Sequence, residues 1–203
     1  MLRRLKAVLA ALAIAVLLPL AASAGPDTPK EVIESYYAQL LKAMQSGAKL
    51  GFKGRYEMLK PWVEKTFDVA LMAQTSVGAY WDKMTADQQK QLIDAFRNFT
   101  IANYAHSFHA YEGEKFVTTD AKETPRKDII VYSAIVKSGG DKVAIDYLLR
   151  ADSDHNYKVI DVFLDGSISQ LATRRSEYTS LIREHGVDAL IAAIRKKAED
   201  LAS

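Results

Sequence analysis

Residues 142–164 read Lys142-Val-Ala-Ile-Asp-Tyr-Leu-Leu-Arg150, Ala151-Asp-Ser-Asp-His-Asn156 and Tyr157-Lys-Val-Ile-Asp-Val-Phe-Leu164. The outer two segments are rich in β-branched and aromatic residues, and the polar segment between them is typical of a turn. In the first segment alternate positions form an apolar set, namely Val143, Ile145, Tyr147 and Leu149. The other positions include Lys142, Asp146 and Arg150. Because side chains alternate along a strand, the pattern predicts a hairpin with one apolar face and one largely solvated face.

Two further runs of strand-forming residues precede this hairpin, at residues 114–119 and 128–137. The turn Gly139-Gly140-Asp141 separates the second of them from Lys142. Short turns join neighbouring antiparallel strands, so the four runs predict a sequential antiparallel meander.

Helical patterns lie on both sides of the strands. Capping boxes open helices at Thr28–Glu31, Thr85–Gln88 and Ser167–Gln170. Between the first two, the glycines at 47, 51 and 54 predict a loop, followed by short helices at 56–66 and 67–77. The order of helices, four strands and helices predicts an α+β fold with the helices packed on one face of a four-stranded antiparallel meander sheet.

The chain begins like an exported protein. A basic start containing Arg3, Arg4 and Lys6 is followed by fourteen residues without a polar side chain, 7–20, and by Ala22-Ser-Ala24. This pattern predicts a signal peptide at 1–24 and a single domain at 25–203. An uncleaved anchor is the alternative, but fourteen helical residues rise about 21 Å, short of a hydrocarbon core of about 30 Å.

The composition excludes several classes of protein. Of 203 residues, 27 are Lys or Arg and 25 are Asp or Glu, and the predicted signal takes three of the basic residues. A charge so near zero argues against nucleic-acid binding. The chain has no cysteine, so neither a disulfide framework nor thiol chemistry is expected, and the core must stabilise the fold.

Two short patterns resemble sites from other proteins. Ser46-x-x-Lys49 has the spacing of penicillin-recognising enzymes, but it stands among glycines and no Lys-Thr-Gly follows. Asp152-x-Asp154-x-Asn156 resembles the start of a calcium loop, whose later glycine and glutamate are missing. We interpret the first as a helix end and the second as a hairpin turn.

Two other groups of side chains are candidates for chemistry. His106 and His109 are three residues apart on one helix but lack an evident third metal ligand. Tyr104, Tyr132, Tyr147 and Asp146 resemble a proton-shuttling pocket, but Asp146 and Tyr147 alternate and must face opposite sides of their strand. We therefore expect no metal, no cofactor and no enzymatic activity.

Large apolar side chains are abundant on surfaces that must face one another. They are Phe67, Met72, Trp81, Phe96, Phe99, Tyr104 and Phe108 on the helices, and Tyr132, Val143, Ile145, Tyr147 and Leu149 on the sheet. They predict either a filled core or an apolar cavity enclosed between helices and sheet. A cavity of this kind suits a lipid, since each buried CH₂ contributes about 0.8 kcal/mol and a C16 chain on the order of 10 kcal/mol.

The C-terminal third carries a set of motifs in a characteristic order. They are Lys158-Val-Ile-Asp161-Val, Gly166-Ser-Ile-Ser169, Arg174-Arg175-Ser176-Glu-Tyr178 and Gly186-Val-Asp-Ala-Leu190-Ile. With Phe67-Asp68, Met72-Ala73 and Val77-Gly78-x-x-Trp81 before them, they resemble the MlaC (toluene-tolerance auxiliary) family over residues 28–201. Tyr104-Ala105-x-x-Phe108 and Leu164-Asp165-Gly166-x-Ile168 are more similar to its hopanoid-associated branch, HpnM.

The resemblance implies a soluble periplasmic lipid carrier. Such a protein holds a phospholipid, or in the HpnM branch a hopanoid, between sheet and helices. Its implied partners are an inner-membrane transporter of the ABC/MCE or RND type and an outer-membrane complex, and we expect a monomer. The alternative is a periplasmic interaction subunit with a filled core and no lipid.

Basic residues near the C-terminus are candidates for docking a membrane partner or an anionic head group. They are Arg174, Arg175, Arg195, Lys196 and Lys197, although runs of charge are most often merely solvated. Asp161 is expected to have a structural role as the ion-pair partner of Arg174 or Arg175.

Overall fold

The computed structural model describes residues 27–203, and the signal peptide predicted at 1–24 lies outside this range. The helices are α1 Pro29–Gln45, α2 Gly47–Thr66, α3 Val69–Val77, α4 Ala86–Ser107, α5 Gln170–His185 and α6 Val187–Asp200, with a 3₁₀ helix, η1, at Gly78–Lys83. The strands are β1 Lys115–Glu123, β2 Ile129–Val136, β3 Lys142–Ala151, β4 Tyr157–Leu164 and β5 Ile168–Ser169. Within the described range, no helix combines the length and the apolar character needed to cross a membrane.

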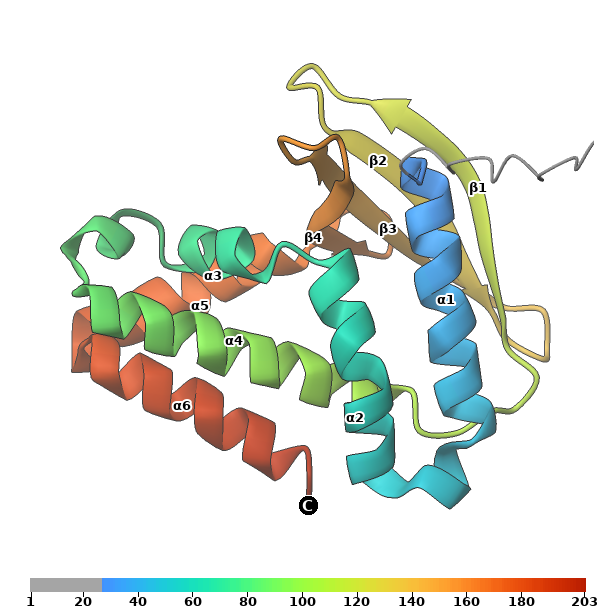
Figure 1. Ribbon diagram of the computed structural model, residues 1–203, viewed down its shortest axis with the longest axis horizontal. Coiled ribbons are helices and arrows are strands. Elements are labelled where there is room, and N and C mark those ends of the chain that lie inside the picture. The colour runs from blue at the N-terminus through green and yellow to red at the C-terminus, as the bar shows by residue number, and fades with distance from the viewer. Residues whose placement is uncertain (1–26) are drawn as a thin grey trace, which may run out of the picture.

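The strands form one antiparallel sheet in the order β1-β2-β3-β4-β5 (Figure 1). This confirms the α+β class and the sequential meander. The four predicted strands are joined by a fifth of two residues, which folds back on the end of β4. Because Ile168 and Ser169 belong to β5, the cap of α5 is Ser169, which accepts from Ala172 N, and not Ser167 as predicted.

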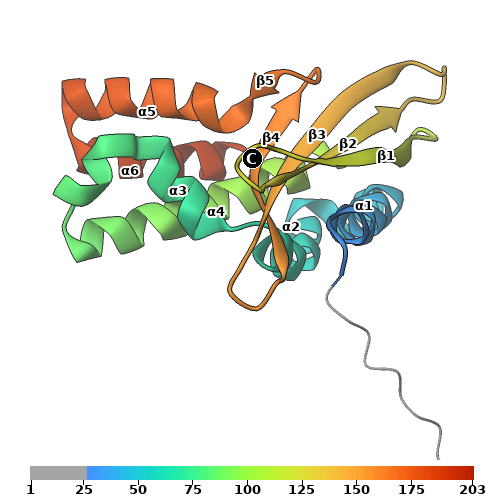
Figure 2. The same ribbon diagram turned by 90° about the horizontal axis from the view of Figure 1, so that it is seen from above.

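Helices α1 and α2 lie on one face of the sheet, while α3 to α6 gather beyond the β4 side (Figures 1 and 2). Tyr37 is central to the contact between α1 and the sheet. Its ring stacks on Phe116 of β1 with centroids 4.6 Å apart, and its hydroxyl lies 2.6 Å from Ser133 Oγ of β2. The ring of Tyr147 of β3 meets the Tyr37 ring edge-on, with centroids 5.7 Å apart. The apolar face predicted for 143–149 is therefore the face that α1 covers.

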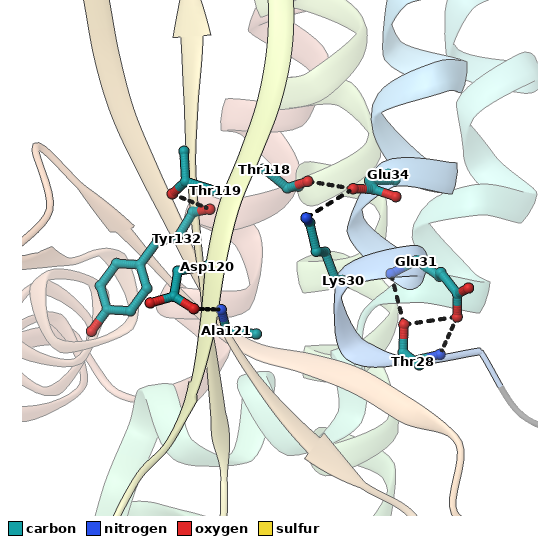
Figure 3. Close-up of polar contacts among 9 residues, drawn as sticks. All are labelled: Thr28, Lys30, Glu31, Glu34, Thr118, Thr119, Asp120, Ala121 and Tyr132. Atoms are coloured by element: carbon teal, nitrogen blue, oxygen red, sulfur yellow. Dashed lines mark hydrogen bonds and ion pairs between the residues drawn. The ribbon is translucent and has the colours of Figure 1, made fainter.

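Tyr132 does not lie on the covered face of the sheet, contrary to its prediction as a cavity residue. Val131 pairs with Tyr147, so both lie on the covered face, and Tyr132 must point to the other side. Figure 3 shows its ring on the side of the sheet remote from α1, and Lys122 Nζ lies 5.5 Å from its centre. The same view shows Thr118 hydrogen bonded to Glu34, which ties α1 to β1, and the predicted capping box at Thr28.

The glycine-rich segment at 47–54 is helical, contrary to the predicted loop. Helix α2 starts at Gly47 and has a kink at Gly51, whose φ of 60° suits glycine. The segment is held by Arg55, whose Nε donates to Ala105 O at 2.8 Å and whose Nη1 donates to Gly47 O at 2.9 Å. A buried guanidinium thus satisfies carbonyl groups at the start of α2 and near the end of α4, which local sequence patterns do not reveal.

Replacing Gly47 by alanine is expected to lower the free energy of unfolding by about 1–3 kcal/mol. A Cβ at this position would overlap the backbone carbonyl of His109, which cannot move without displacing the end of α4. Gly139 is a matched control, because a Cβ there meets no atom within 4 Å and its φ needs no glycine. Urea denaturation measures both variants, and equal stability of Gly47→Ala and Gly139→Ala would contradict the close packing.

Candidate functional site

A cavity of about 240 Å³ lies between the covered face of the sheet and helices α3, α4 and α5. Its wall is mostly apolar. The residues are Phe67, Met72, Phe96, Thr100, Asn103, Tyr104, Ser107, Phe108, Ile145, Tyr147, Val162, Leu164, Gln170, Leu171 and Arg174. Helices α4 and α5 stand on opposite sides of this cavity, while α3 and α6 each pack against both of them. The polar residues of the lining lie on α4 and α5, whereas α3 and the sheet contribute apolar and aromatic side chains.

Seven of the twelve apolar candidates line the cavity. They are Phe67, Met72, Phe96, Tyr104, Phe108, Ile145 and Tyr147. They come from three separate stretches of the chain, 67–72, 96–108 and 145–147, so only the tertiary fold brings them together. Their role in lipid binding stays a prediction.

The other five candidates lie outside the cavity lining. Tyr132 is on the remote face of the sheet, and Trp81 is in η1, at the end of the helical group away from the sheet (Figure 1). Leu149 is fully buried beyond the register shift between β3 and β4, where it pairs with Val159 in the packed core. Val143 is partly buried and packs against the hydrophobic core. The ring of Phe99 lies beneath the guanidinium of Arg174.

Sequence reasoning missed three apolar wall residues, Val162, Leu164 and Leu171. The first two alternate with Asp161 and Phe163 along β4, and Val162 pairs with Tyr147 while Leu164 pairs with Ile145. The same alternation that was applied to β3 would have found them. Leu171 had no such signal, because its position depends on how α5 is attached to β4.

Asp161 attaches α5 to the sheet, and its prediction as a partner of Arg174 or Arg175 is wrong. Its Oδ1 accepts from the backbone N–H of Leu171 at 3.0 Å, and its Oδ2 accepts from Ser169 Oγ at 2.5 Å. The carboxylate is buried and caps the first turn of the helix, where the positive end of the helix dipole favours a negative charge.

Tyr104 and Tyr147 form part of the inner wall of the cavity, and Tyr36 and Tyr37 pack against them from behind. Burial raises the pKa of Tyr36 and Tyr147 well above the ordinary value, with the neighbouring tyrosine hydroxyls adding to the shift. Burial also raises the pKa of Tyr104 and, less strongly, that of Tyr37. These hydroxyls therefore stay neutral at physiological pH, and the inner wall carries no charge.

Among the five basic candidates, only Arg174 lines the cavity. Its guanidinium carbon lies 4.6 Å from the centre of the Phe99 ring and 5.7 Å from that of Phe96. Arg175 points away and packs against Gly78. The remaining three have partners on the surface: Arg195 donates to Gln91, Lys196 pairs with Asp200 and Lys197 pairs with Glu177.

The histidine pair is occupied by backbone contacts. His106 Nδ1 lies 3.2 Å from Leu201 O, and His109 Nδ1 lies 2.8 Å from His106 O. In residues 27–203 no three His, Cys, Asp or Glu side chains converge as they would around a metal ion.

The two short patterns that resemble an enzyme motif and a calcium loop have structural roles. Asp152 Oδ1 accepts from the backbone N–H groups of Asp154 and Asn156, which closes the hairpin turn. Ser46 ends α1.

The cavity holds less than a complete lipid. A protein cavity of about 150 Å³ holds one benzene molecule, so about 240 Å³ accommodates roughly ten carbons on the same scale. A wider and more open groove of about 620 Å³ lies elsewhere, between α2, α4 and α6. Lys53, Arg195 and Glu199 line that groove, so it lacks the uncharged inner wall of the smaller cavity.

Comparisons with known proteins identify a family and a fold. A family model described as MlaC protein matches residues 34–196. Among solved structures, a phospholipid-binding protein from Ralstonia solanacearum, in complex with a phospholipid, superposes with a TM-score of 0.74 at 19% sequence identity. The match covers 86% of this chain and 98% of that one, and at this identity it shows a common fold.

Proposed function

Because this chain belongs to the MlaC family, we propose that it is a periplasmic lipid carrier that holds hydrocarbon tails in the cavity between β3, β4 and helices α4 and α5. The observation that carries the proposal is the hollow itself. Its inner wall is apolar or neutral, and its polar residues gather on α4 and α5. A carrier needs this division, since tails leave water while the head group stays near it.

Several further points support lipid as the cargo. The Ralstonia protein of the same fold is a phospholipid-binding protein. The alternative, an interaction subunit with a filled core, does not account for about 240 Å³ of space among large apolar side chains. A C16 tail exceeds roughly ten carbons, so the carrier must widen its cavity or leave part of the tail at the rim.

The transport role extends the same proposal. The carrier would pass its lipid between an inner-membrane transporter, of the ABC/MCE or RND type, and acceptors at the outer membrane. Tails held by apolar contacts are released without breaking specific bonds, which suits a shuttle. The cargo is a phospholipid or a hopanoid, and lipid analysis distinguishes them.

Replacing Leu164 by aspartate is expected to lower the amount of lipid that co-purifies with the protein at least about tenfold, since an unpaired carboxylate in an apolar wall costs several kcal/mol. Ile130→Asp is the matched control: Ile130 is also half-buried but lies on the remote face of the sheet, opposite Lys122. The measurement is mass spectrometry of lipids extracted from protein purified from its own periplasm.

Each outcome of this experiment has a defined meaning. Lipid that is present in the wild type and in Ile130→Asp but lost in Leu164→Asp supports the carrier. A diacyl phospholipid or a hopanoid in the extract identifies the cargo. Lipid retained by a folded Leu164→Asp variant, or absent from the wild type, contradicts the proposed function.

A further inference from the structure

Arg174 is a cation at the rim of the cavity without an anionic partner. Its guanidinium lies against the rings of Phe99 and Phe96, and Nη1 is 3.5 Å from the hydroxyl of Tyr178. None of the ion pairs formed by residues 27–203 includes it. Contact with ring faces uses no N–H group, so most of the five guanidinium donors stay available.

The other polar residues near Arg174 line the cavity from α5 and from α4. Gln170 stands one turn before Arg174 on α5, so the two share a face of that helix. Across the cavity, Asn103 and Ser107 are also one turn apart on α4, and both contribute to the lining. The rim therefore combines one fixed positive charge with amide and hydroxyl groups, and the lining contains no carboxylate.

This chemistry is that of an oxyanion site. A half-buried guanidinium has lost part of its hydration, and without a carboxylate it gains most from an anion that arrives with the ligand. Its planar fork matches the oxygens of a phosphate, and the aromatic rings below it restrict its movement. A neutral polycyclic lipid or a diacylglycerol offers no such partner.

We propose that Arg174 binds the phosphate of a phospholipid head group at the rim, and that it makes the cavity selective for phosphate-bearing lipids. This inference rests on the proposed function, because it assigns the head-group end of the same cavity. Arg174 is then the residue that orients the lipid, with the tails directed toward Tyr147 and Ile145.

The test compares two ligands with the same tails, dioctanoyl phosphatidylglycerol and dioctanoylglycerol, by calorimetry with delipidated protein. Arg174→Met retains the side-chain stem over Phe99 and removes the charge. It is expected to weaken binding of the phosphatidylglycerol about 10- to 100-fold and that of dioctanoylglycerol less than about threefold. Arg174→Lys, which has the charge without the fork, is expected to lie between wild type and Arg174→Met. The control is Arg183→Gln, an exposed arginine on the same helix that contacts Ser180.

The outcomes separate this inference from the proposed function. Equal losses for both lipids in Arg174→Met, or no loss for either, overturn the head-group assignment. Inorganic phosphate is the third probe, and competition with phosphatidylglycerol at similar concentrations would make Arg174 a site for free phosphate and also overturn it. Failure of the wild type to bind either lipid contradicts the carrier itself, whereas equal binding of both lipids contradicts only the selectivity.

Discussion

Above about pH 10 the protein is expected to lose stability steeply, by about 4 kcal/mol per pH unit, until it unfolds. The cause is a group of tyrosines in and behind the inner wall of the cavity. Burial raises the pKa of Tyr36, Tyr104 and Tyr147 above the value of about 10 that tyrosine has in an unfolded chain. Above that pH the unfolded chain releases phenolic protons that the folded chain retains.

The sign of the effect follows from proton counting. A raised pKa in the folded state gives stability that is fully present below about pH 10 and is lost as the pH rises through the folded pKa values. Each retained proton contributes about 1.4 kcal/mol per pH unit, and three such groups give the expected slope. Urea unfolding at a series of pH values, followed by tyrosinate absorbance, measures it.

Single substitutions identify the groups responsible. Tyr147→Phe and Tyr36→Phe are each expected to reduce the slope by about a third, whereas Tyr111→Phe, at an exposed site, leaves it unchanged. The hydroxyl of Tyr36 has no hydrogen-bond partner within the described residues, so Tyr36→Phe is also expected to stabilise the protein at neutral pH by about 1 kcal/mol. A slope that all three variants share would show that other groups cause the alkaline transition.

Replacing Asp161 by alanine is expected to destabilise the protein by about 3–4 kcal/mol and to weaken lipid binding with it. The substitution leaves the N–H of Leu171 and the hydroxyl of Ser169 without their acceptor at the start of α5. Helix α5 carries Leu171 and Arg174, so a loosened attachment opens the cavity wall. Urea denaturation and lipid mass spectrometry on the same preparation measure the two effects.

Two variants make the assignment of Asp161 specific. Asp161→Asn retains an oxygen acceptor but no charge, so it is expected to cost about half as much as Asp161→Ala. Asp141→Ala removes an exposed carboxylate in the β2–β3 turn and is expected to change stability by less than about 0.5 kcal/mol. If Asp161→Ala unfolds at the same urea concentration as Asp141→Ala, the carboxylate does not hold α5.

Local patterns predicted the elements of this fold well where their signals were local. The capping boxes at Thr28 and Thr85 and the hairpin turns after β2 and β3 lie where the sequence places them. The segment at 47–54 departed from its pattern because Arg55, in the same helix, donates both to Gly47 O at the start of the segment and to Ala105 O of α4. A tertiary contact of this kind overrides the low helix propensity of glycine.

In the candidate site, too, local patterns predicted some features and tertiary contacts decided the others. Alternation along β3 correctly put Ile145 and Tyr147 on the inner face. It did not distinguish them from Leu149 on the same face, which lies beyond a register shift in packed core. Among the basic residues, position along the chain did not separate Arg174 from Arg175. One turns over Phe99 into the cavity and the other turns toward Gly78.

By itself the sequence determined the α+β class, the order of the strands, the apolar face of the sheet and the resemblance to the MlaC family. Each of these depends on neighbours in the chain, through strand alternation, helix capping and turn chemistry. Only the tertiary structure decided where the hollow lies, which side chains surround it and which arginine reaches its rim. An unfilled volume is the difference between the space that distant elements enclose and the side chains that fill it, and no local pattern contains that difference.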